Sequence, residues 1–150
     1  MPRIRITPVS AGSLTIVEVP EGGASSVLSE AYTNATDEAI LAYSLVRVTA
    51  GGGLALVDAS DKATASASGF LVGTTNPGAL GRILTSGASS YLREPGSPIP
   101  ANNAMLYASH TTPGTATCVA PHTEGGSLVQ LGRVANGKVL VNLRLEVELY

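Results

Sequence analysis

The sequence predicts a single, mainly antiparallel β domain, built as a β-sandwich or β-barrel, with at most one or two short helices. Three observations support this fold class. The chain has 150 residues, the size of one domain, and its 17 glycines and 9 prolines break it into short strands and turns. Lysine occurs only at Lys62 and Lys138, whereas long surface helices are usually rich in lysine. Apolar and polar residues alternate near the C-terminus, as they do in a strand with one buried face.

Two strands at the C-terminus are predicted to pair as a hairpin. The apolar positions of the last strand are Val139, Val141, Leu143, Leu145, Val147 and Leu149. The strand before it runs from Leu128 to Val134, and Ala135-Asn136-Gly137 separates the two. Because Asn-Gly adopts positive φ at low cost, it favours the tight turn of a hairpin.

Turn residues divide the rest of the chain into short apolar segments. We expect strands at residues 14–19, 45–49, 54–57, 69–73, 81–85, 105–108 and 115–120. Turns at intervals of about 8 to 12 residues are typical of a sandwich or a barrel. Residues 94–100 contain three prolines, which lack the N–H that a strand ladder needs, and therefore predict a surface loop.

The organisation of the chain follows from these elements. Residues 1–23 are interpreted as an N-terminal arm with the first strand, and residues 24–150 as the β-rich domain. The segment 24–43 is the one place where we expect a helix, with Thr36 as the N-cap of residues 37–43. An alternative organisation has two small β lobes that are separated at the loop 94–100.

The composition disfavours several classes of partner. The formal net charge is −2, the basic residues do not cluster, and the aromatic residues are one phenylalanine and five tyrosines. The sequence therefore offers neither the basic footprint nor the stacking platform of a nucleic-acid-binding protein. No apolar run approaches the about 18 residues of a membrane span, and the N-terminus lacks the apolar core of a signal peptide. We expect neither nucleic acid nor a membrane as a partner.

Two histidines and one cysteine are the candidates for catalysis or metal binding. Cys118 and His122 could form a nucleophile and base, but Pro121 lies between them and no residue orients the imidazole. His110, Cys118 and His122 do not have zinc-site spacing and lack a fourth ligand. We interpret Cys118 as a small buried side chain of a strand. The sequence therefore predicts no catalytic residue, no metal ligand and no cofactor.

The acidic motifs and the sequon are interpreted as structural. Asp58 and Asp61 lack the longer acidic series of a calcium loop, so they are assigned to a turn. Glu146 and Glu148 share one face of the last strand, where we expect solvated charges rather than the carboxylate pair of a glycosidase. Asn34-Ala35-Thr36 fits the glycosylation sequon, which has no weight without a secretion signal.

A series of short motifs from Tyr43 to the C-terminus resembles a known family. The opening strand Leu45-Val46-Arg47-Val48 and a glycine turn are followed by Ala67-Ser68-Gly69-Phe70-Leu71-Val72-Gly73 and by Gly81-Arg82-Ile83-Leu84-Thr85-Ser86-Gly87. Val129-Gln130-Leu131-Gly132-Arg133 and the strand from Val139 to Leu143 then close the pattern. In this order the motifs resemble the capsid decoration (cement) proteins of tailed bacteriophages.

The resemblance implies a structural, non-enzymatic role on a virus particle. Such a protein binds the outer surface of the phage head and clamps neighbouring subunits of the major capsid protein. It usually does so as an oligomer, and we expect a homotrimer ahead of a homodimer. Two alternative functions stay open at this point. One is a receptor-binding module of a phage tail fibre, which shares the composition, and the other is a small hydrolase that acts through Cys118 or the carboxylates.

The N-terminal arm is the predicted contact with the capsid or with a sister subunit. In Arg3-Ile4-Arg5-Ile6, charged and apolar side chains alternate, and Pro2 and Pro8 prevent the segment from extending as a helix. As an added strand on a neighbour's sheet edge, it would place Ile4 and Ile6 on one face and Arg3 and Arg5 on the other. The alternative is that the arm is the first strand of the protein's own sheet.

Overall fold

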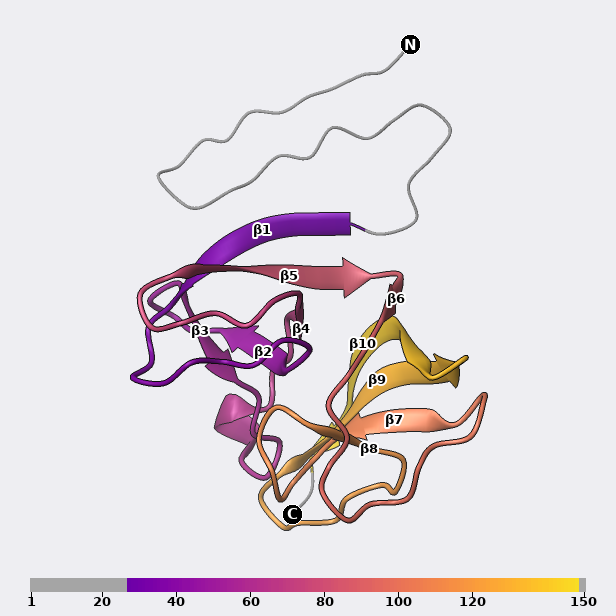
Figure 1. Cartoon of the computed structure of the whole chain (residues 1–150). Coiled ribbons are helices and arrows are strands. Elements are labelled where there is room, and N and C mark those ends of the chain that lie inside the picture. Colours follow the sequence, from indigo (N-terminus) through magenta and orange to yellow (C-terminus); the bar gives the residue numbers. More distant parts are fainter. Residues whose placement is uncertain (1–26, 149–150) are drawn as a thin grey trace.

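The computed structural model contains a closed five-stranded barrel and a second five-stranded sheet (Figure 1). It describes residues 27–148, and the fold prediction of a mainly β barrel or sandwich is confirmed. The elements are β1 Val27–Asn34, β2 Leu45–Val48, β3 Gly53–Leu56, η1 Lys62–Thr64, β4 Gly69–Leu71, β5 Leu80–Ser86, β6 Ala88–Ser89, β7 Met105–Ala108, β8 Ala116–Thr117, β9 Ser127–Ala135 and β10 Lys138–Glu148.

The barrel has the strand order β1-β3-β2-β4-β5, and β5 pairs back to β1. All of its pairings are antiparallel except that of β1 with β3, where Thr33 lies opposite Gly53. Glycine is needed where β4 meets β5. A Cβ at Gly69 would lie 2.2 Å from Cγ2 of Ile83 and 2.6 Å from the carbonyl oxygen of Leu84. The missing side chain therefore permits the close approach that closes the barrel.

The second sheet has the order β6-β10-β9-β7-β8 and contains the predicted C-terminal hairpin. Asn136 and Gly137 have φ of 52° and 77°, as a type I′ turn requires at both central positions. The pairing of β9 with β10 and its pairing with β7 both shift register between Gly132 and Gln130. A Cβ at Gly132 would lie 1.9 Å from the carbonyl oxygen of Leu140, so this position also requires glycine.

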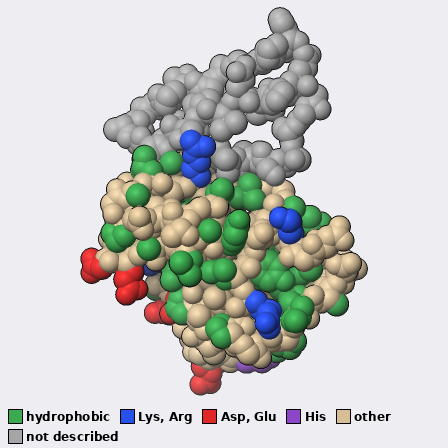
Figure 2. Space-filling model, in the orientation of Figure 1, with side chains coloured by type: hydrophobic (Ala, Val, Ile, Leu, Met, Phe, Trp, Pro, Cys, Tyr) green, Lys and Arg blue, Asp and Glu red, His purple; other side chains and the backbone are tan. Residues whose placement is uncertain are grey.

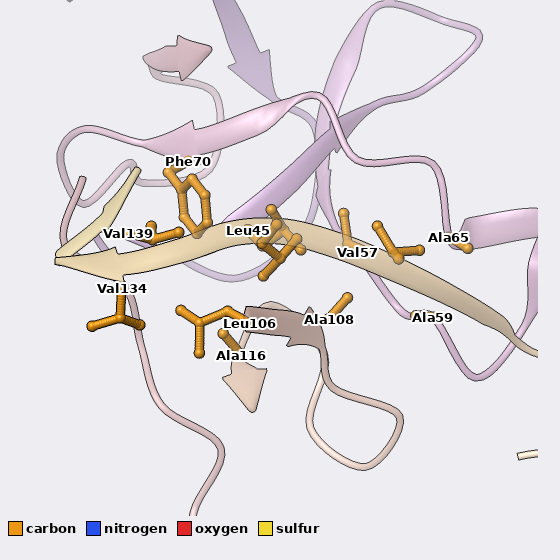
Figure 3. Packing of buried hydrophobic residues seen from close by; sticks show 12 residues of the cluster. Leu45, Val57, Ala59, Ala65, Phe70, Leu106, Ala108, Ala116, Val134 and Val139 are labelled. Atoms are coloured by element: carbon orange, nitrogen blue, oxygen red, sulfur yellow. The ribbon is translucent and has the colours of Figure 1, made fainter. Parts of the chain in front are cut away.

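Most of the core lies between the barrel and the second sheet. Phe70, Leu45 and Val57 of the barrel region form one cluster with Leu106 and Val139 of the sheet, as Figure 3 shows. A smaller cluster consists of barrel residues alone: Ile40, Val46, Leu54, Leu71 and Ile83. Because the larger cluster draws on both sheets, each sheet covers apolar surface that the other would otherwise expose.

The proline-rich loop does not separate two lobes. The change from barrel to sheet occurs between β5 and β6, whereas residues 94–100 lie within the second sheet, between β6 and β7. The shared core joins the two sheets. The predicted surface loop itself is confirmed, with Gly96 at φ 80° and the Ser97 N–H bonded to the Glu94 carbonyl at 3.1 Å.

The expectation of a helix in residues 24–43 is wrong. Residues 27–34 form β1, and the only helical turn in residues 27–148 is η1. Thr36 caps no helix, because its hydroxyl bonds to Oδ1 of Asn34 at 2.6 Å and to the Glu38 carbonyl oxygen at 2.9 Å instead of accepting a helical N–H. Ile40 forms a β-bridge with Thr75 instead of continuing a helical turn. Long-range pairing has overridden a local helical tendency.

One strand is shorter than expected, and the helical turn η1 is short as well. The strand expected at 115–120 is limited to Ala116–Thr117, since the Val119 N–H turns back to the Thr117 hydroxyl at 3.1 Å. Within the described part of the chain, no helix is long and apolar enough to cross a membrane.

Candidate interaction surface

The cysteine and the histidines do not form a catalytic or metal-binding cluster in the described structure. Cys118 was predicted to be a buried strand residue, but it is half-buried and follows the end of β8. It packs against the main core, and its thiol contacts the Pro98 carbonyl oxygen at 3.8 Å. His122 is exposed. Among residues 27–148, no group of three or more His, Cys, Asp or Glu side chains could hold a metal ion.

His110 has a structural role. Its Nε2 lies 2.7 Å from the Ser127 carbonyl oxygen, and its Nδ1 accepts the Thr123 N–H at 3.3 Å. Because Nδ1 accepts, Nε2 carries the proton and donates to Ser127. Gly126 makes room for the ring, since a Cβ there would lie 2.9 Å from Cε1 of His110. The imidazole thus holds the segment before β9 against the end of β7, with both nitrogens engaged.

The sequon asparagine is buried and serves as the centre of a hydrogen-bond network. The side chain of Asn34 is 1% exposed, and its Nδ2 donates to the Glu38 carbonyl at 2.8 Å and to the Thr75 carbonyl at 2.9 Å. Its Oδ1 accepts from Thr36. Both amide hydrogens are used, so this asparagine has no free nitrogen for a glycan in the folded protein.

The two aspartates form a turn, as predicted. Oδ1 of Asp58 accepts the Ser60 N–H at 3.1 Å, and Oδ1 of Asp61 accepts the Ala63 N–H at 2.9 Å at the start of η1. The carboxyl side chains of Glu146 and Glu148 lie outside what the structure describes, although both residues belong to β10. The predicted contact residues Arg3, Ile4, Arg5 and Ile6, and the expected strand 14–19, lie outside the described residues.

The described surface instead presents a rigid apolar projection on the proline-rich loop. Ile99 is 80% exposed and lies between Pro98 and Pro100, whose rings fix their φ angles. Val119 is 55% exposed. The contact of the Cys118 thiol with the Pro98 carbonyl brings the two segments together. We call Pro98, Ile99 and Val119 the proline tip.

Hydrogen bonds at the base of the loop fix the proline tip. The Arg93 guanidinium and the Ser97 hydroxyl bond to the carbonyl oxygens of Ser97 and Glu94, respectively. The Glu94 carboxylate accepts from the Ser109 hydroxyl, and the Glu94 N–H bonds to the Ala116 carbonyl at 2.8 Å. The loop is thereby tied to the end of β7 and to β8. Because these bonds already fix its backbone, the loop loses little conformational freedom on binding.

Tyr91, which precedes the proline-rich loop in the sequence, packs against the main core. Burial raises the pKa of its hydroxyl above the ordinary value of 10.0; a nearby negative charge on Cys118 adds to the increase, and Arg93 opposes it. The neutral phenol is therefore the form that the fold favours.

The rest of the visible surface carries few charges. Figure 2 shows green hydrophobic side chains among tan uncharged side chains and backbone, with the lysines and arginines of this face set apart from one another. The sequence signal for the proline tip was the Pro-Ile-Pro segment in an otherwise polar loop. The prolines predict the loop, but the exposure of Ile99 depends on the tertiary structure.

No protein-family model and no curated protein matches this chain.

Proposed function

We propose that this chain is a capsid decoration protein, which binds the exterior of a phage head and stabilises contacts between subunits of the major capsid protein. The observation that carries the proposal is the proline tip, an apolar projection on a braced loop. A clamp of this kind acts through shape and apolar contact and needs no reactive group.

The arrangement of the resembling motifs supports the proposal. Their first three segments contain β2, β4 and β5, which are consecutive neighbours in the barrel, and the last two form the hairpin of β9 and β10. Three glycines of these motifs lie where an added Cβ would come within 3.0 Å of another residue, namely Gly69, Gly81 and Gly132. The motifs therefore describe one connected scaffold, and the loop that carries Ile99 lies between β6 and β7 of its second sheet.

The tip suits a shallow apolar groove between two capsid subunits. Full burial of an isoleucine side chain contributes about 1.5–3 kcal/mol, and Val119 adds to the same contact.

The test uses heads of the encoding phage that have been stripped of decoration protein. We would mix them with the purified chain, pellet them, and image them by electron microscopy. The expected result is hundreds of bound copies distributed over the head. Ile99→Asp should weaken binding by about 100-fold, because the apolar contact is lost and a carboxylate must be desolvated.

Leu80→Asp is the matched control, since Leu80 is 60% exposed and lies on β5, outside the proline tip. It should bind like the parent protein. Absence of binding to heads would overturn the proposal. A handful of copies at the tail would overturn it in favour of a receptor-binding module.

A further inference from the structure

The outer side of the second sheet contains a hollow that is apolar and basic. It measures about 560 Å³ and is lined by Met105, Gln130, Gly132, Arg133, Leu140, Val141, Asn142 and Arg144 of strands β7, β9 and β10. We call it the basic hollow. The register shifts between Gly132 and Gln130 lie in this part of the sheet.

Among the side chains that the structure describes, no acidic residue lines the basic hollow. Nη1 of Arg133 bonds to the Asn103 carbonyl at 2.9 Å, which holds the guanidinium in place, and no carboxylate among the described side chains pairs with it or with Arg144. Leu140 is half exposed between these two cations. The matching ligand is a carboxylate pair next to an apolar side chain.

The barrel of the same chain carries such a group. Asp37 and Glu38 line a second hollow of about 430 Å³ with Ile40 and Leu56, and no basic residue lines it. Leu41 follows directly in the sequence and is 57% exposed. We call Asp37, Glu38 and Leu41 the acidic rim. The buried Asn34 amide binds the Glu38 carbonyl and thus fixes the rim before any partner arrives.

We propose that copies of this chain associate head to tail, with the acidic rim of one copy in the basic hollow of the next. Carboxylates then face Arg133 and Arg144, while Leu41 packs on Leu140. In Figure 1 the β1–β2 connection, which contains the rim, and the β9–β10 turn lie at opposite sides of the molecule. One copy therefore cannot satisfy its own hollow, and each copy offers one rim and one hollow.

This self-association goes beyond the proposed function, because it uses neither the proline tip nor a capsid. A heterologous contact of this type repeats from copy to copy, and it forms a ring if the rotation between copies closes and an open filament if it does not.

Charge reversal tests the contact in the absence of capsids. The mass of the full chain in solution would be measured by light scattering over a range of concentrations for four proteins. These are the parent, Asp37→Lys with Glu38→Lys, Arg133→Glu with Arg144→Glu, and the variant that carries all four substitutions. All four positions are exposed, so the monomer fold should survive.

The parent should associate, and each double variant should do so at least about 30-fold more weakly, because like charges then face each other. The fourfold variant should regain association, since the charges are complementary again with the signs exchanged. Raising the salt from about 0.05 M to about 0.5 M should weaken association of the parent. A monomeric parent, a double variant that associates like the parent, or a fourfold variant that stays monomeric would each overturn the inference.

Discussion

Gly132→Ala is expected to destabilise the protein far more than alanine at Gly137, the other glycine of the same hairpin. The added Cβ would lie 1.9 Å from the carbonyl oxygen of Leu140, 2.9 Å from its carbonyl carbon and 3.2 Å from the N of Asn142. All three atoms belong to the backbone of β10, so no side chain can move aside. Gly132 also has φ of 137°, which side-chain-bearing residues rarely adopt.

The size of the effect follows from these two contributions. The backbone conformation costs about 1–3 kcal/mol, and forcing the strands apart costs about 1–3 kcal/mol more. We therefore expect a loss of about 4 kcal/mol in the free energy of unfolding, out of the about 5–15 kcal/mol of an ordinary domain. With an m-value of about 2 kcal/mol/M, the urea midpoint should fall by about 2 M.

The matched control is Gly137→Ala in the turn of the same hairpin. Gly137 has φ of 77°, but nothing lies within 4 Å of its added Cβ. Only backbone strain applies there, at about 1 kcal/mol. Urea unfolding followed by far-ultraviolet circular dichroism measures both variants. Equal losses for the two variants, or a loss below about 1.5 kcal/mol for Gly132→Ala, would refute the reasoning on close approach.

Two further substitutions test the network at Asn34 and the environment of Tyr91. Asn34→Ala should lower the free energy of unfolding, measured in urea, by about 3 kcal/mol, because the Glu38 and Thr75 carbonyl oxygens lose a buried donor. A loss below about 1 kcal/mol would contradict this role of Asn34. Because the pKa of Tyr91 is raised in the folded protein, its neutral phenol contributes stability that is complete below about pH 10 and is lost as the pH rises through the folded pKa. Tyr91→Phe should therefore flatten the decline of Tm between about pH 9 and about pH 11.5. Parallel declines for the parent and the variant would show that Tyr91 ionises equally in the folded and unfolded chains.

The parts of the fold that local chemistry dictates could be predicted from the sequence. Asn136-Gly137 favours one turn geometry, and the alternation in the last strand fixes which side chains face the core. Met105–Ala108 lies where its apolar segment was expected. In each case the residues that determine the conformation are close neighbours in the sequence.

The parts that depend on distant partners were not predictable. Residues 37–43 have local helical character, but Asn34 and the bridge of Ile40 with Thr75 decide their conformation. The parallel pairing of β1 with β3 has no local signature either. Burial is likewise a property of the whole fold, so the sequence could not show that Asn34 is covered and Ile99 is uncovered. The acidic rim and the basic hollow bring together residues that only the tertiary structure makes neighbours.

The pairing of β1 with both β3 and β5 sets the order in which the chain can fold during synthesis. Local hairpins form first, because closing a short loop sacrifices little entropy. The ring of strands, however, stays open until Leu80–Ser86 has been made to pair with Val27–Asn34. Even then Phe70 and Leu45 lack their cover, since Leu106 and Val139 are synthesised later. The nascent barrel therefore leaves the ribosome with one apolar side exposed, on which neighbouring nascent chains would aggregate. Strands β7 and β10, which emerge later, cover this apolar side.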